Sequence, residues 1–130
     1  MTDMSDADII RRGFELFAQG DMEKLSQLFA ADAVWVVPGQ GPVAGPKHGW
    51  DEIVAFFGEL FERSGGTLRA ELDYVVAGDG HAVALNRNVA TRRGESLEQR
   101  AVIAFDMANG QIRRAEQYFD DTTENDRFWA

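Results

Sequence analysis

Several kinds of site are excluded by residues that the sequence lacks. It contains no cysteine, so disulfide bonds, thiolate metal ligands and a cysteine nucleophile are all ruled out. Its two histidines, His48 and His81, lie far apart with no cluster of carboxylates beside them, and no glycine-rich phosphate motif joins a strand to a helix. We therefore predict neither a metal site nor a bound cofactor.

Long apolar runs are also missing. None approaches the roughly 18–20 residues that a membrane-spanning helix needs. The first residues, MTDMSDAD, are acidic and polar, the reverse of a secretory signal. These features predict a cytoplasmic protein that does not enter a membrane.

Basic residues are too few for a nucleic-acid-binding surface. The chain has 13 Lys and Arg against 22 Asp and Glu, a net charge of −9, whereas tracking phosphates requires the opposite sign. A length of 130 residues, 45% of them hydrophobic and 27% charged, is typical of one globular domain. We assign that domain to residues 1–130.

The spacing of apolar residues predicts three helices before most of the strands. The first begins at the capping box Ser5–Asp8 and ends at Gly20, and a short second helix begins at Asp21. The third lies within residues 50–63, where Ile53, Phe56, Phe57, Leu60 and Phe61 form one apolar stripe. Between the second and third helices, AVWVV (33–37) is a predicted strand.

Four further strands are predicted from alternating patterns. They cover residues 67–77, 81–93, 96–108 and 111–121, and Asn109-Gly110 has the form of a type I′ hairpin turn. In the first of them the alternation puts Leu68, Ala70, Leu72, Tyr74 and Val76 on one face. Residues 122–130 are interpreted as a tail. Helices followed by an antiparallel meander predict an α+β domain.

The stretches GDMEKLSQLFAADAVW and PGQGPVAGPKHGWDEIVAFF resemble the nuclear transport factor 2-like superfamily, in its SnoaL-like and ketosteroid isomerase-like branch. SGGTLRAEL, NGQI and QYFDD…DRFW extend the resemblance over nearly the whole chain. It implies a cone, in which a curved antiparallel sheet wraps three N-terminal helices around an internal pocket. It also implies a homodimer that pairs through the outer face of the sheet.

The resemblance gives a meaning to the segment Pro38–Gly49, which holds all three prolines and four of the thirteen glycines. Proline fixes φ and glycine permits positive φ, so the segment specifies one irregular path. In the cone fold it crosses the rim near the pocket mouth. It is either a shaped lip over a ligand site or simply a tight crossover, and the sequence leaves both open.

Catalytic groups of related enzymes are replaced at the matching positions. The ketosteroid isomerase base, tyrosine and aspartate correspond to Val37, Gly13 and either Ala101 or Ile103. The aspartate that SnoaL-type cyclases and epoxide hydrolases carry on the last strand corresponds to Gln117, which cannot take a proton at neutral pH. The Arg-x-Asp pair of the epoxide hydrolases corresponds to Asn86 and Asn88, and their first-strand tyrosine to Trp35.

The strand at residues 81–93 has two faces with different residues. One carries Val83, Leu85 and Val89 and the other carries alanines and asparagines. The larger apolar set would be the core on sequence grounds alone, whereas the resemblance turns the small and amide residues inward. The resulting prediction is a pocket for an uncharged, mostly apolar molecule. Its predicted lining is Trp35, Phe57, Leu60, Asn86, Asn88, Gln99, Gln117 and Phe119.

Three charged or titratable residues are weak candidates for a role at this pocket. His48, in the loop, and Asp121, at the end of the last strand, are the two candidate proton carriers. Arg113 shares the inward parity of Gln117 and is a candidate partner for a carboxylate.

Three hypotheses follow. The favoured one is a binding protein for a small apolar or amphipathic molecule, without the family's catalytic carboxylates. The second is an enzyme of the cyclase, isomerase or epoxide hydrolase type that uses a different acid/base set. The third is a purely structural dimer module.

Overall fold

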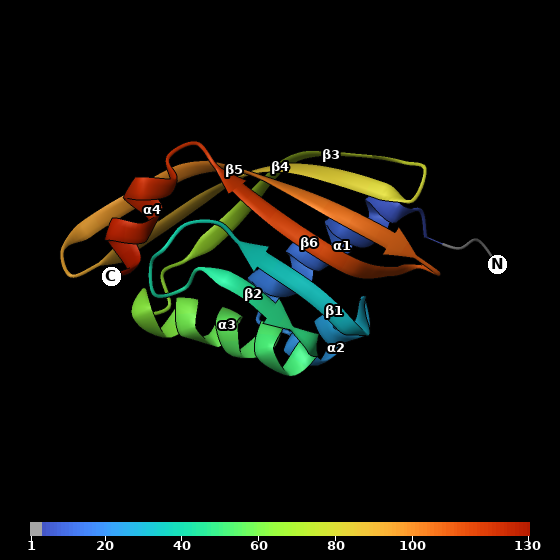
Figure 1. The fold of residues 1–130 in the computed structure, drawn as a ribbon, viewed down its shortest axis with the longest axis horizontal. Coiled ribbons are helices and arrows are strands. Elements are labelled where there is room, and N and C mark those ends of the chain that lie inside the picture. The colour runs from blue at the N-terminus through green and yellow to red at the C-terminus, as the bar shows by residue number, and fades with distance from the viewer. Residues whose placement is uncertain (1–3) are drawn as a thin grey trace.

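The computed structural model describes residues 4–130 as a strongly curved sheet whose inner face is covered by helices (Figure 1). The elements, in chain order, are α1 (Asp6–Gln19), α2 (Met22–Ser26), β1 (Phe29–Val37), β2 (Gly45–His48), α3 (Gly49–Arg63), β3 (Arg69–Gly78), β4 (His81–Arg92), β5 (Glu95–Ala108), β6 (Gln111–Phe119) and α4 (Thr122–Trp129).

The strands form one six-stranded sheet in the order β2-β1-β6-β5-β4-β3. The meander from β3 to β6 is antiparallel throughout, and β1 joins its far side through a pairing with β6. The predicted α+β cone is therefore confirmed. The resemblance implied an antiparallel sheet, and one pairing differs from that description, because β1 runs parallel to β6.

The hairpins of the meander turn on residues with positive φ. Asn109 and Gly110 have φ of 53° and 74°, which confirms the predicted type I′ geometry. Asp79-Gly80 and Arg93-Gly94 have nearly the same values, so the three hairpins share one way of reversing the chain.

Two β-bulges break the alternation on which part of the sequence prediction depended. In β3 an extra residue, Asp73, lies between the pairs Leu72–Asn86 and Tyr74–Leu85. Val75 consequently points inward, whereas Tyr74 and Val76 are 57% and 58% exposed, contrary to the prediction that they share one face with Leu68, which is buried.

In β6 the extra residue is Arg113, between the pairs Ile112–Met107 and Arg114–Asp106. The prediction that Arg113 faces inward is wrong for this reason. Its side chain is exposed, and a guanidinium nitrogen lies 3.8 Å from a carboxylate oxygen of Asp32.

Two short elements were not predicted. Strand β2 lies inside the proline- and glycine-rich segment, and it tolerates Pro46 because it is an edge strand, where one backbone N–H is not needed for pairing. Helix α4 occupies the supposed tail. It begins where the Asp121 carboxylate accepts a hydrogen bond of 3.0 Å from the Glu124 backbone N–H.

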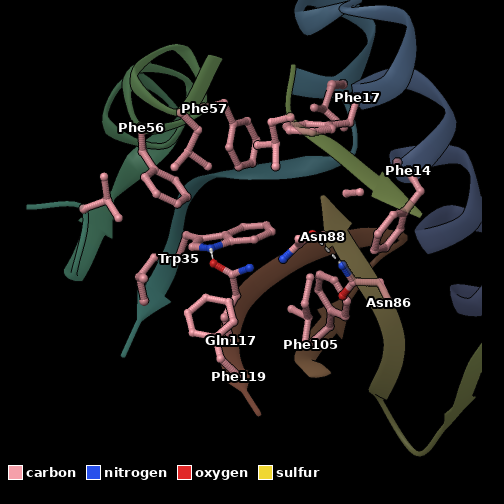
Figure 2. Close-up of a pocket in the computed structure, with 18 of the residues that line it drawn as sticks. Phe14, Phe17, Trp35, Phe56, Phe57, Asn86, Asn88, Phe105, Gln117 and Phe119 are labelled. Carbon is pink, nitrogen blue, oxygen red and sulfur yellow. Dashed lines mark hydrogen bonds between the residues drawn. The ribbon is translucent and has the colours of Figure 1, made fainter. Parts of the chain in front are cut away.

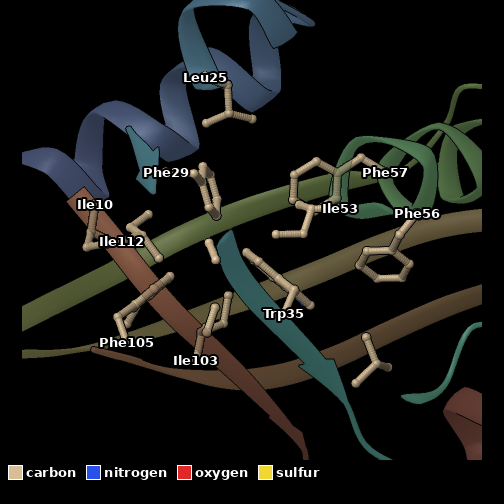
Figure 3. Close-up of a cluster of buried hydrophobic side chains, with 14 of the residues drawn as sticks. Ile10, Leu25, Phe29, Trp35, Ile53, Phe56, Phe57, Ile103, Phe105 and Ile112 are labelled. Atoms are coloured by element: carbon tan, nitrogen blue, oxygen red, sulfur yellow. The ribbon is translucent and has the colours of Figure 1, made fainter. Parts of the chain in front are cut away.

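The core lies between the helices and the inner face of the sheet, where α1, α3, β1 and the meander all contribute buried side chains (Figure 3). Phe128 and Trp129 are each 2% exposed within this one chain. They therefore pack on the cone itself.

A clasp joins α4 to the segment that follows β1. The Asp126 carboxylate accepts hydrogen bonds of 2.9 and 3.0 Å from the backbone N–H groups of Gln40 and Gly41. Gly39 has a φ of +103°, and a Cβ there would overlap the same carboxylate, so only glycine fits. The irregular segment is thus shaped in part to bring its amides to Asp126.

We predict that Asp126→Ala lowers the free energy of unfolding by about 1–3 kcal/mol, because two backbone donors lose a charged acceptor. Urea unfolding measures the change. The control is Asp120→Ala, which removes an exposed carboxylate with no side-chain hydrogen bond among residues 4–130. Equal stability of the two variants would contradict this role for the clasp.

Candidate functional site

A cavity of about 100 Å³ lies between the helices and the inner face of the sheet (Figure 2). A single water needs roughly 10–15 Å³ of such space, so the cavity exceeds a packing defect. All eight residues that the sequence placed at a pocket, from Trp35 to Phe119, are among those that line it. Their contact with a ligand remains a prediction.

Aromatic rings form most of the wall. Trp35 of β1 meets Phe57 of α3 edge to face, with ring centroids 5.2 Å apart, and Phe57 meets Phe17 of α1 in the same way at 5.2 Å. Such pairs contribute roughly 0.5–1.5 kcal/mol each beyond the area that they bury. The wall is therefore a connected set of rings fixed by their mutual packing, with Phe14 and Phe105 on the side of Asn86 (Figure 2).

The polar part of the wall is a chain of neutral amides. Asn86 Nδ2 donates to Asn88 Oδ1 at 2.9 Å, and Asn88 Nδ2 donates to Gln99 Oε1 at 3.0 Å. Gln99 Nε2 then donates to Asn125 Oδ1 at 3.1 Å, and the Trp129 indole N–H donates to the same oxygen at 3.1 Å. This amide chain connects β4, β5 and α4.

A second polar pair, formed by Trp35 and Gln117, also lies on the wall of the cavity (Figure 2). The Trp35 indole N–H donates to Gln117 Oε1 at 2.9 Å. An indole nitrogen can only donate, so Gln117 must turn its oxygen toward the ring. Its Nε2 has no protein partner within residues 4–130 and remains available as a donor.

Strand β4 positions the asparagines as the resemblance predicted. Asn86 and Asn88 are 1% and 8% exposed and face inward with Ala82, Ala84 and Ala90. Val83 is 39% exposed on the other face. Small side chains on the inner face of β4 leave room beside the amides, and this orientation is confirmed.

The lining contains no titratable group in the part of the chain that the structure describes: no Asp, Glu, His, Lys or Arg contributes to it. Lys47 comes near from outside, with its Nζ 5.2 Å from the centroid of the lining residue Phe56. Burial lowers the pKa of Lys47, although Glu59 and Glu52 oppose that shift.

The two candidate proton carriers lie elsewhere. His48 is exposed at the N-terminus of α3, where its backbone N–H donates to Glu52 Oε1 at 2.8 Å. Asp121 is exposed and caps α4. Neither residue lines the cavity.

Sequence reasoning missed the contribution of α4, which supplies Asn125 and Trp129 to the lining. The signal was Asp121 followed three residues later by Glu124, a pattern typical of a helix start. It also missed Val43, which the irregular segment contributes to the wall.

The model of the SnoaL-like domain matches residues 10–115. An uncharacterised protein of Mycobacterium tuberculosis is 38% identical over 131 residues, covering 100% of both chains. The chain belongs to the SnoaL-like family. Its fold is that of nuclear transport factor 2-like proteins.

Solved structures agree with this assignment. Bal32a, from a soil-derived mobile gene cassette, is 36% identical, with 96% of each chain covered and a TM-score of 0.93. TerC, co-crystallised with polyporic acid, is 23% identical, covering 95% of this chain and 97% of its own, with a TM-score of 0.84. At that identity TerC shows a common fold alone. Within residues 4–130, no helix combines the length and the apolar character that crossing a bilayer requires.

We predict that Gln117→Glu makes stability depend on pH. The new carboxyl keeps an acceptor for Trp35, but burial raises its folded pKa above the ordinary value of about 4.3. A raised acid pKa means that the folded state binds the proton more tightly than the unfolded state does. The variant therefore loses stability relative to the native protein as pH rises, by about 1.4 kcal/mol for every tenfold difference in proton affinity between the two states.

Chemical unfolding between pH 4 and pH 8 measures this difference. The control is Gln40→Glu, since Gln40 is exposed and outside the cavity. If the free energy of unfolding of Gln117→Glu differs from that of the native protein by the same amount at every pH, the site is solvated and the prediction is wrong.

Proposed function

We propose that the protein binds a small, uncharged, mostly apolar or amphipathic molecule in the cavity between α1, α3 and the sheet. The observation that carries this proposal is the composition of the lining, which combines aromatic rings with neutral amides and has no titratable side chain among the described residues. Such a wall offers apolar area and a few directional hydrogen bonds.

The energetics favour a neutral ligand. An ion moved from water into this wall would lose its hydration without gaining a charged partner, which is costly. A neutral ring loses little hydration and gains dispersion contacts with Trp35, Phe57 and Phe105. The absence of the family's catalytic carboxylates is part of the proposal, since Gln117, Asn86 and Asn88 stand at the matching positions.

The alternative is an enzyme of the cyclase, isomerase or epoxide hydrolase type with a different acid/base set. It would require His48 or Asp121 to reach a substrate from outside the lining. It predicts a pH–rate profile that disappears when one of those residues is changed. The open volume of the cavity, in turn, counts against a purely structural module with a filled core.

We predict saturable binding of toluene and much weaker binding of benzoate, by at least about a hundredfold, because benzoate brings an unpaired charge. Ligand-observed NMR and calorimetry measure both. Ala70→Phe should abolish toluene binding, since Ala70 lines the cavity beside Asn88 and a ring there would fill it.

The matched control is Ala77→Phe on the same strand, at an exposed position that does not line the cavity. Toluene binding that survives in Ala70→Phe, or benzoate binding as tight as toluene, would refute the proposed site.

We also propose a homodimer that pairs through the outer face of the sheet. Two apolar rows cross this face. One follows the register Tyr74–Leu85–Val102–Tyr118, and the other follows Val76–Val83–Ala104. Tyr74, Val76 and Tyr118 are each at least 50% exposed, so the rows form an apolar patch on an otherwise charged surface.

We predict that Val83→Arg weakens self-association by at least about a hundredfold, because the dimer would bury an unpaired charge at the centre of the patch. Sedimentation velocity across a concentration series measures the change. Ser96→Arg, exposed at the far end of β5, serves as the control. A native protein that is monomeric at every concentration would overturn the dimer.

A further inference from the structure

We infer that the molecule bound in the cavity donates a hydrogen bond to Asn86 Oδ1, and therefore that it is a hydroxyl- or N–H-bearing compound, such as a phenol, rather than a pure hydrocarbon, ether or ester. This inference rests on the proposed function. It concerns the chemical class of the ligand and the group that recognises it.

The starting observation is one orphaned acceptor. Asn86 is 1% exposed, and its Oδ1 is the buried side-chain oxygen or nitrogen for which residues 4–130 provide no hydrogen-bond partner. The other buried amide oxygens of the wall, on Asn88, Gln99, Gln117 and Asn125, all accept a bond. An unpaired buried carbonyl is destabilising, and the residue that carries this one is among those that line the cavity.

The orientation of Asn86 is fixed from the far end of the amide chain. The Trp129 indole nitrogen can only donate, so Asn125 must present Oδ1 to it. Gln99 donates to that same oxygen and must therefore approach it with Nε2, which leaves Gln99 Oε1 facing Asn88.

The same step repeats along β4. Gln99 Oε1 can only accept, so Asn88 must turn its Nδ2 toward it as the donor. Asn88 then turns its Oδ1 toward Asn86, which must donate from its own Nδ2. Rotating any one amide by 180° would place two oxygens or two nitrogens against each other. The donor-only indole of Trp129 thus sets the direction of every bond, and the unused group at the other end has to be the oxygen of Asn86.

A ligand hydroxyl at this position completes the chain. It would donate to Asn86, which donates to Asn88, Gln99 and finally Asn125, and bonds that follow one direction polarise and strengthen one another. Phe14 and Phe105 lie beside Asn86 in Figure 2 and provide apolar surface for the rest of the molecule. An ether or a hydrocarbon of equal size would leave the acceptor unpaired.

The test compares phenol, anisole and toluene on the native protein by calorimetry or ligand-observed NMR. A hydroxyl is costly to remove from water, so a wall without a free acceptor would favour toluene over phenol by about tenfold or more. We expect phenol to bind at least as tightly as toluene and about tenfold more tightly than anisole.

Asn86→Leu, close in size, should reverse the order to favour toluene. Gln40→Leu removes an exposed amide outside the cavity and should leave the order unchanged. Because Asn86→Leu also removes the donor to Asn88, a second measurement uses the native protein. Side-chain ¹³C-labelled asparagine should show the Asn86 carbonyl shifting downfield with phenol but not with toluene.

The outcomes separate the two proposals. Tenfold preference for toluene in the native protein, with an unchanged Asn86 carbonyl signal, overturns the donor requirement while leaving an apolar binding site in place. Equal affinities for all three probes would also overturn the donor requirement, because a water molecule would then be donating the hydrogen bond to Asn86 Oδ1. Binding of none of the probes overturns both this inference and the proposed function.

Discussion

The amide chain from Asn86 to Asn125 is the constraint on which the rest of the structure depends. Polar groups buried without partners are destabilising, so placing asparagines on the inner face of β4 commits the protein to supplying partners for them. Gln99 on β5 and Asn125 on α4 are those partners. The sheet and the C-terminal helix are therefore tied to one another through the wall of the cavity.

Helix α4 carries Asn125, the last residue of the amide chain, and contacts on two sides hold the helix in place. Asp126 accepts two backbone N–H groups of the segment after β1. At the other end of the helix, Arg63 donates to the Trp129 carbonyl at 2.9 Å and Arg92 donates to the carbonyl of Ala130. Cations at a helix C-terminus are favourably placed against its dipole. Both attachments keep Asn125 and Trp129 at the cavity.

The sequence predicted what depends on local pattern and family resemblance. The first three helices, the meander, the Asn109-Gly110 turn and the inward face of β4 follow from spacing, turn chemistry and that resemblance. The bulges at Asp73 and Arg113 could not be predicted from the sequence, because an extra residue in a strand does not change its composition. It does, however, move every later side chain of that strand to the other face of the sheet than alternation predicts.

The two missed elements had a different cause. Proline and glycine in β2 argue against a strand unless its edge position is known, and position in a sheet is not a local property. Residues 122–130 are polar on average, and their few apolar side chains are buried where α4 packs against β5 and β6, contacts that no local window contains. Most of the predicted cavity residues lie on strands, and the resemblance predicted which face of each strand points inward.

The direction of the amide chain illustrates how little of the site any single residue determines. Asn, Gln and the ligand could each be oriented in two ways if taken alone, and sequence gives no preference between them. Trp129 and Trp35, which can only donate, remove that freedom at two points of the wall. The result is a mostly apolar cavity wall on which Asn86 has an unpaired acceptor and Gln117 an unpaired donor. This arrangement of one acceptor and one donor needs no ionised group. The indole N–H groups of Trp129 and Trp35, both on the wall, determine which way the amides point.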